Sequence, residues 1–185
     1  PDAPPAEPLR IRFNSQIQHG PFAGGTLAAA VVDSELVLDA ATQAEVAKLF
    51  GNNTPLTSHT VFKLDGSGTS KVLSPAFASQ FPNPETGEPV SIAWEGISAT
   101  VDFAPGMSRY TMTGEAPKLE VKDPAGAHMV MTGMRFTGEQ QRLFDDEPLL
   151  FSGKQRVTID AVQMNIPEQR SEERRVGKEC TVLCR

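Results

Sequence analysis

Hydrophobic and polar residues alternate along most of the chain. The first case begins at Leu9, where Leu9, Ile11, Phe13 and Ile17 alternate with polar residues, and Ile97–Phe103 repeats the pattern. A period of two places apolar side chains on one face of a β-strand and leaves the other face to water. Further strand-like runs, bounded by residues typical of turns, are 28–38, 57–64, 69–73, 108–113, 118–122, 128–136 and 149–164.

Only Ala40–Phe50 predicts a helix. Asp39 can accept hydrogen bonds from the free N–H groups of the first turn, and Gly51 can end the helix in a left-handed conformation. A helix of this length is marginal alone, so we expect it to pack on the sheet through its apolar side. The predicted fold class is therefore mainly β (α+β), a curved antiparallel sheet or meander with one packed α-helix near residues 40–50.

A short motif recurs in the second half: a large apolar residue, any residue, then glycine. The four glycines, 18, 19 and 20 positions apart, could permit bulges that curve a sheet. We expect each interval to hold two strands and two connections, as in an antiparallel meander of hairpins stacked in series. The copies are Trp94-Glu-Gly96, Met112-Thr-Gly114, Met131-Thr-Gly133 and Phe151-Ser-Gly153.

Both ends of the chain differ from its middle. Residues 1–8 contain four prolines, which fix φ and remove N–H donors, and predict an extended linker. Residues 170–180 match, residue for residue, one reading frame of a common short-read sequencing adapter. We therefore interpret 170–185 as a non-native, adapter-derived tail, and residues 9–169 as a fragment of a larger β-rich domain.

Removing the tail changes the charge and the cysteine count. The whole chain has a formal charge of −6; the tail holds five basic and three acidic residues, which leaves 12 basic and 20 acidic residues, or −8. Cys180 and Cys184 both lie in the tail, so residues 1–169 have no cysteine. A chain without cysteine fits an oxidising compartment, where stray thiols are a liability.

Composition argues against two classes of partner. The chain has no run of about 18 apolar residues, which a membrane-spanning helix needs. It also has no block of Lys and Arg that would bind a phosphate backbone. We expect no nucleic-acid binding and no membrane span within this segment.

No reactive constellation stands out. His19, His59 and His128 lie in different predicted elements, and none has a Cys, His or carboxylate at ligand spacing. Gly66-Ser67-Gly68 fits a hairpin turn better than a nucleophile elbow or a phosphate loop. Residues 145–147, two aspartates and a glutamate, could bind a hard cation but are better explained as a solvated turn. We predict no catalytic, cofactor-binding or metal-binding residues, and no cofactor.

The methionines suggest a surface. All six lie in the second half, where thioethers can fill a core or line an adaptable apolar surface. If the sheet is curved and its apolar face is open, these residues with Phe103, Phe136 and Phe151 would form a groove for an acyl chain. The six are Met107, Met112, Met129, Met131, Met134 and Met164.

Four segments carry a family resemblance. They run from Phe13-Asn-Ser-Gln-Ile-Gln-His19-Gly20-Pro21-Phe22 through Val32-Asp-Ser-Glu-Leu-Val-Leu38 and Pro55-Leu-Thr-Ser-His-Thr-Val-Phe-Lys-Leu-Asp65-Gly66-Ser67 to Trp94-Glu-Gly96. In their order these segments resemble the YdgA-type proteins of Gram-negative bacteria, a family of unknown function, over roughly residues 9–164. The resemblance implies an N-terminal anchor in the inner membrane, upstream of this fragment, and a long β-rich portion in the periplasm.

Together these features predict an uncharacterised cell-envelope protein with a non-enzymatic structural or interaction role. Binding of a hydrophobic ligand, such as a lipid, in a groove of the sheet is one alternative, and a hydrolase is another. The partners that stay open are the membrane, through the missing anchor, a second copy of the chain, and a lipid.

Overall fold

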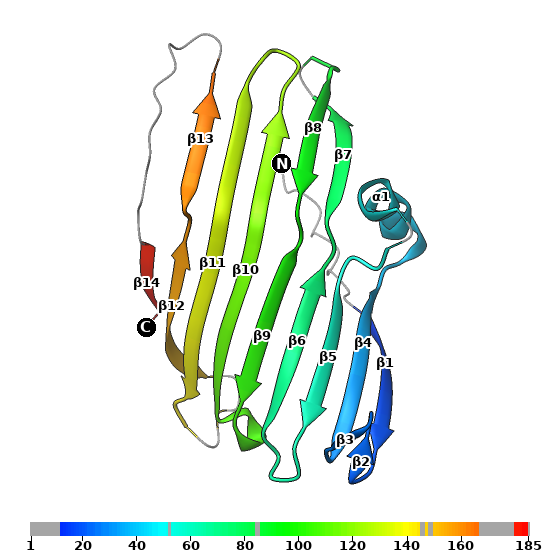
Figure 1. Ribbon diagram of the computed structural model, residues 1–185, viewed down its shortest axis with the longest axis vertical. Helices are drawn as coiled ribbons and strands as arrows, with labels where there is room; N and C mark the ends of the chain where they lie inside the picture. Colours follow the sequence, from blue (N-terminus) through cyan, green and yellow to red (C-terminus); the bar gives the residue numbers. More distant parts are fainter. Residues whose placement is uncertain are drawn as a thin grey trace, which may run out of the picture.

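The computed structural model is a broad antiparallel sheet with one helix at its margin (Figure 1). It describes residues 12–51, 53–83, 86–144, 147 and 150–166, and the backbone of 180–184. The helix α1 (Ala40–Phe50) is the predicted one: Asp39 Oδ1 accepts a hydrogen bond of 2.9 Å from the Thr42 N–H, and Gly51 follows with φ 59°.

The remaining regular elements are strands and one short 3₁₀ turn. Neighbouring strands are antiparallel throughout. In chain order they are β1 (Arg12–His19), β2 (Phe22–Ala23), β3 (Thr26–Leu27), β4 (Ala30–Val37), β5 (Thr57–Phe62), β6 (Gly68–Ser74), β7 (Phe77–Pro82), β8 (Pro89–Trp94), β9 (Ile97–Phe103), η1 (Pro105–Met107), β10 (Arg109–Lys122), β11 (His128–Arg142), β12 (Phe151–Thr158), β13 (Ala161–Asn165) and β14 (Cys180–Cys184).

The sheet is built around two long strands. The order across it is β1-β4-β5-β6-β9-β10-β11-β12-β14. Beyond the ends of β9 and β12, β8 continues along β10 and β13 continues along β11, while β7 pairs with β8. The pairs β6–β7, β8–β9 and β12–β13 are each one extended strand interrupted by two residues. Five long strands therefore lie side by side across this part of the sheet (Figure 1).

A row of irregular residues crosses these five strands at one level: Pro75, Gly96, Pro117, Gly133 and Asp160. The register is the same on both sides of the row, as the partners Glu115–Ser98 and Leu119–Trp94 show. Two of the five residues are glycines with positive φ, 90° at Gly96 and 62° at Gly133. We call this line the bulge row.

Hydrogen bonds show that each strand gains one residue at the bulge row. Two carbonyls of β10 point toward the neighbouring strand β8–β9. The Arg109 carbonyl, before the bulge row, accepts a hydrogen bond from the Ala104 N–H, and the Lys118 carbonyl, after the row, accepts one from the Glu95 N–H. Carbonyls of a regular strand alternate in direction, so two that point the same way are an even number of residues apart. Arg109 and Lys118 are an odd number apart, which requires one extra residue between them, as in a β-bulge.

The extra residue explains a change of phase in the hydrophobic pattern. In β9 the apolar residues are Ile97, Ala99, Val101 and Phe103, whereas in β8 they end at Trp94, three positions before Ile97. The bulge places the apolar residues of β8 and those of β9 on the same face of the sheet. The same spacing of three positions across the bulge row separates Ala116 from Leu119, Met131 from Met134 and Ile159 from Val162.

Across β8 to β13 the sheet therefore has two chemically distinct faces, whereas in β4 to β6 the pattern is mixed, because Val31, Val61 and Leu73 share a face with the polar residues. The apolar face carries Phe77, Ile92, Trp94, Leu119, Val121, Met129, Met131, Val162 and Met164 above the bulge row, and Phe62, Ile97, Val101, Phe103, Tyr110, Met112, Met134, Phe136 and Val157 below it. The polar face carries Glu95, Lys118, Glu120, Lys122 and His128 above, and Asp33, His59, Lys71, Thr100, Thr113, Arg135, Thr137, Lys154 and Arg156 below.

Few side chains of the described residues are buried. Ala23, Ala28 and Val31 form one small cluster with Val61, where β2 and β3 pack at a corner of the sheet. Phe103 and Ala116 are the other two buried hydrophobic residues. The helix contacts the sheet at β7, where the Phe50 and Phe77 rings lie 4.9 Å apart. Among the described residues the sheet is thus a single layer whose apolar face is covered only at β7, by α1.

Most sequence-based predictions of elements are confirmed, and several differ in detail, among them the strand predicted at 128–136, which continues to Arg142. Residues 108–113 and 118–122 belong to one strand, β10, because proline at 117 removes only one N–H from the ladder. The single strand predicted at 149–164 is replaced by two, Phe151–Thr158 and Ala161–Asn165, because the bulge interrupts them at Asp160. Strands β7 and β8 lie in the segment 75–94, which has four prolines and for which the sequence predicts no strand.

The recurring glycines do not enclose two strands each. Each interval contains parts of two long strands and a single connection, since the strands have up to 15 residues rather than five or six. Gly96 and Gly133 lie in the bulge row. Gly114 lies opposite Phe136, whose ring leaves no room for a Cβ.

We predict that Gly133→Ala destabilises the sheet by about 1–3 kcal/mol, because alanine disfavours positive φ and its Cβ would collide with the Asp160 carboxylate. Gly138→Ala, in the same strand, is the matched control: its Cβ would meet nothing closer than 3.6 Å. We expect this control to change stability by less than about 0.5 kcal/mol. Urea unfolding followed by Trp94 fluorescence measures both, and equal effects would contradict the role of Gly133.

Candidate functional site

The apolar face is the strongest candidate for a binding surface. Five of the six methionines lie on it, and Met107 lies in the η1 turn. Methionine side chains are flexible and polarizable, so a surface rich in them can adapt to differently shaped apolar partners. The five are Met112, Met129, Met131, Met134 and Met164.

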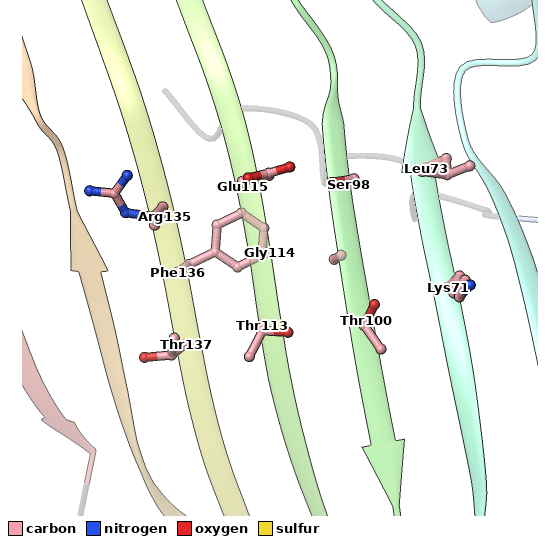
Figure 2. A pocket seen from close by; sticks show the side chains of 11 residues that line it. Lys71, Leu73, Ser98, Thr100, Thr113, Gly114, Glu115, Arg135, Phe136 and Thr137 are labelled. Carbon is pink, nitrogen blue, oxygen red and sulfur yellow. The ribbon is translucent and has the colours of Figure 1, made fainter.

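Aromatic rings fill the spaces that glycines leave on this face. Phe103 is the register partner of Gly68, and Phe136 is the register partner of Gly114. In each pair the ring lies across the glycine of the neighbouring strand, where a Cβ would collide with it. Figure 2 shows the Phe136 ring extended over Gly114. Each ring therefore covers the position of a missing side chain on the neighbouring strand.

Shallow hollows occur on the polar face. The one in Figure 2 has a volume of about 380 Å³ and lies over β6, β9, β10 and β11. Its polar-face lining includes Lys71, Thr100, Thr113, Glu115 and Arg135. A second, of about 440 Å³, lies beside His59 and Asp33.

Two of the three histidines pair with carboxylates that sequence spacing did not indicate. His59 Nδ1 lies 2.7 Å from Asp33 Oδ1, and His128 Nε2 lies 2.9 Å from Glu120 Oε1. Asp33 and His59 are direct register partners on β4 and β5. The register of the ladder could have revealed this pair, but spacing along the chain could not. His19, at the end of β1, is exposed, and the three imidazoles lie on separate strands.

Glu120 is the most strongly perturbed acid among the described residues. Its carboxylate accepts hydrogen bonds from Lys118 Nζ at 2.8 Å, Lys122 Nζ at 2.6 Å and His128 Nε2 at 2.9 Å. The bond from Lys118, followed by those from Lys122 and His128, lowers the pKa of Glu120 to about 2. In return, the hydrogen bond to Glu120 raises the pKa of Lys118. The Glu120 carboxylate therefore stays ionised, and the two lysines that contact it carry more positive charge than it neutralises.

The other predicted features of the sequence have structural explanations where they are described. Asp65 accepts hydrogen bonds from the Ser67 hydroxyl at 2.7 Å and the Ser67 N–H at 2.9 Å, which confirms Gly66-Ser67-Gly68 as a hairpin turn. The hydroxyl bond is the main reason why the pKa of Asp65 lies below its ordinary value. Asp145 and Asp146 lie outside the described residues, as do the side chains of Cys180 and Cys184.

Two kinds of site are absent from the part of the chain that the structure describes. No three His, Cys, Asp or Glu side chains there are grouped so that they could hold a metal ion. No helix there has the length and hydropathy needed to cross a membrane.

These features define a class of protein: an open, single-layer antiparallel sheet with one apolar and one polar face. The family of bacterial proteins of unknown function designated DUF945 matches residues 1–177, and the chain belongs to this family. Neither the curated proteins nor the solved structures include a match to the chain.

We predict that the Glu120 carboxyl titrates near pH 2, as measured by ¹³C NMR of its side chain. Because the pKa is about 2 when folded, against 4.5 ordinarily, its contribution to stability is complete above pH 4.5 and is lost as pH falls toward 2. Lys118→Met should raise the midpoint, and Glu120→Gln should flatten stability against pH in this range. An unchanged midpoint in Lys118→Met would contradict this account.

Proposed function

We propose that this chain is the sheet portion of a bacterial cell-envelope protein and acts without catalysis, by presenting its apolar face to an apolar partner. The observation that carries the proposal is the open apolar face itself. Side chains there and at the sheet's margin reach solvent, with Val157 47%, Met164 53% and Ile17 54% exposed. Contiguous apolar surface of this extent marks an interaction site in soluble proteins.

The energetics of the sheet support this proposal. A sheet with one apolar face is stable when another layer removes that face from water. Each buried leucine- or methionine-sized side chain gains about 1.5–3 kcal/mol from that transfer. Among the described residues only α1 supplies a contact of this kind, at β7. A partner that covers the face would therefore gain much of its affinity from hydrophobic burial.

The geometry of the histidines supports a non-enzymatic role. Hydrolysis through a histidine needs a nucleophile or water positioned by its second nitrogen in a sheltered site. In the described part of the chain, His59 and His128 have hydrogen bonds to carboxylates and none to a hydroxyl. The His59 and Asp33 side chains are about half exposed, at 51% and 52%. The hydrolase alternative therefore has less support.

The location in the envelope rests on two sequence features. Residues 1–169 have no cysteine, which suits an oxidising compartment. The segments described above resemble YdgA-type proteins, whose anchor would lie upstream of residue 1. Together they favour the periplasmic side of the inner membrane.

Lipid binding is a second candidate function, favoured by the methionines. Acyl chains are flexible, and thioether side chains adapt to them better than branched residues do. The face is also long enough: the 14 residues of β10 span about 46 Å at about 3.3 Å per residue, more than the ~30 Å hydrocarbon thickness of a bilayer.

We predict that Met112→Lys lowers the amount of bound apolar ligand several-fold, because the ammonium would place an unpaired charge on the apolar face. Thr113→Lys is the matched control, since the next residue of β10 lies on the polar face. Native mass spectrometry of co-purified lipid and binding of a hydrophobic dye measure the effect. Equal loss in both variants would contradict a face-specific site, and lipid absent from the unchanged protein would favour a protein partner.

We predict that alkaline phosphatase fused after residue 169 in the full-length bacterial protein is active, because this enzyme folds only where its disulfides form. A fusion before the upstream anchor is the control and should be inactive. Activity in neither position would contradict the periplasmic location.

A further inference from the structure

The loops at one end of the sheet all expose large apolar side chains. Register partners trace one row across eight strands, from His19 of β1 to Gly153 of β12. Beyond this row, at the lower end of Figure 1, lie the loops 20–29, 63–67, 104–108 and 143–150. We call six of their side chains, which are between 49% and 80% exposed, the loop tips: Phe22, Leu27, Leu64, Met107, Leu143 and Phe144.

The turns at the opposite end of the sheet lack this feature. Residues 83–88 connect β7 to β8, and residues 123–127 connect β10 to β11. Their sequences, Asn-Pro-Glu-Thr-Gly-Glu and Asp-Pro-Ala-Gly-Ala, contain no large apolar residue. Single exposed apolar residues are ordinary, whereas a group of them on neighbouring loops marks an interaction surface. We propose that the loop tips insert into the surface of a lipid bilayer with zwitterionic headgroups.

The loops are held to one another and so present the tips together. The Arg142 N–H donates to the Ser108 carbonyl at 2.8 Å, and Arg142 Nη2 donates to the Gly106 carbonyl at 2.6 Å. A Cβ at Gly66 would meet Pro105 at 3.7 Å, so the loops 63–67 and 104–108 are also in contact. Met107 has φ 53°, which is uncommon for a residue other than glycine, and about half of its side chain is exposed. Strain of this kind is typical of functional loops.

The geometry of the tips fits a flat partner. The register row crosses eight strands, or seven spacings of about 4.8 Å, which is about 34 Å. Phe22 and Leu27 are register partners near one end of this row, and Leu143 and Phe144 lie near the other. The tips project from separate loops and do not line a groove. A lipid surface can receive all of them at once, with the apolar side chains at the boundary between headgroups and acyl chains.

The chain's own flanking segments leave the sheet away from the tips. Arg12 of β1 pairs with Val37, and Asn165 of β13 pairs with His128, so both strands have these residues at their far ends. A continuation that returned along the outer edge of β12 would arrive beside residues 143–150. From there to β6 is four strand spacings, or about 19 Å, and β2 lies further still. Such a segment would leave Phe22 and Leu64 open to a bilayer.

Charge selects the kind of lipid. Among the described residues of the four loops, the charged ones are Lys63, Asp65 and Glu147. Anionic lipids attract clusters of Lys and Arg, but these loops offer one lysine against two carboxylates. Binding would therefore come from insertion of apolar side chains, which a zwitterionic surface permits. This surface goes beyond the proposed function, which uses the apolar face of the sheet.

The first test measures flotation of the 185-residue chain with phosphatidylcholine vesicles. Phe22→Ser combined with Leu64→Ser should weaken partitioning at least about tenfold, because two inserting side chains are lost. Phe13→Ser combined with Leu73→Ser is the matched control, since it removes one phenylalanine and one leucine that are 54% and 52% exposed away from the tips. The control should partition within about twofold of the unchanged chain. Equal loss in the two double variants would overturn the proposal.

A fluorescence measurement tests insertion without removing apolar side chains. In a Trp94→Phe background, Leu64→Trp should shift its emission to the blue on phosphatidylcholine vesicles and should be quenched by brominated acyl chains. Leu73→Trp is the control and should show neither effect. An unquenched tryptophan at position 64 would contradict insertion. Adding phosphatidylglycerol should strengthen binding less than about twofold, and a large gain that salt abolishes would contradict the zwitterionic preference.

Two further variants separate the tips from other surfaces. Met112→Lys alters the apolar face and should leave vesicle binding within about twofold. If it abolishes vesicle binding and the Phe22 and Leu64 changes do not, the lipid meets the apolar face and the tip proposal is wrong. In the full-length bacterial protein without vesicles, Leu64→Cys should react with a maleimide, as mapped by mass spectrometry. Protection of that cysteine would mean that a protein segment covers the tips, which also overturns the proposal. Circular dichroism confirms that each variant has formed its sheet.

Discussion

The bulge row is the constraint on which the two-faced sheet depends. Strands of 14 or 15 residues would place their apolar side chains on opposite sides of the sheet in its two halves if they alternated without interruption. One extra residue in each of the five strands, at one level, keeps the apolar side chains together and the register unchanged. Asp160 shows this most directly, because its N–H and its neighbour Ala161 both lie opposite Thr132.

The residue types in the bulge row suit the backbone conformations and the missing hydrogen bonds of a bulge. A bulge needs backbone conformations that most residues avoid, and Gly96 and Gly133 adopt positive φ without cost from a Cβ. Pro75 and Pro117 remove N–H groups where the ladder is interrupted. At the end of the row Asp160 forms an ion pair with Arg135 of β11, which ties the bulge to the next strand on the polar face.

Sequence reasoning succeeded where the signal is local and failed where it depends on pairing. The cap at Asp39 and the stop at Gly51 gave the helix its bounds, and the turn at Asp65 was also predicted, because each uses neighbouring residues. The phase change between Trp94 and Ile97 is visible in the sequence, but it means a bulge only once the partner strands are known. The pairing of His59 with Asp33 has the same origin: two residues far apart in the chain meet because of register.

The methionine-rich face has a further chemical consequence. A thioether is oxidised to a sulfoxide more readily than any aliphatic side chain, and the product is polar. Five such groups lie on the same face, so oxidation would convert an apolar surface into a hydrated one. Reductases that regenerate the thioether would restore it. The methionines make the surface adaptable. They therefore also make its hydration depend on oxidative damage and repair.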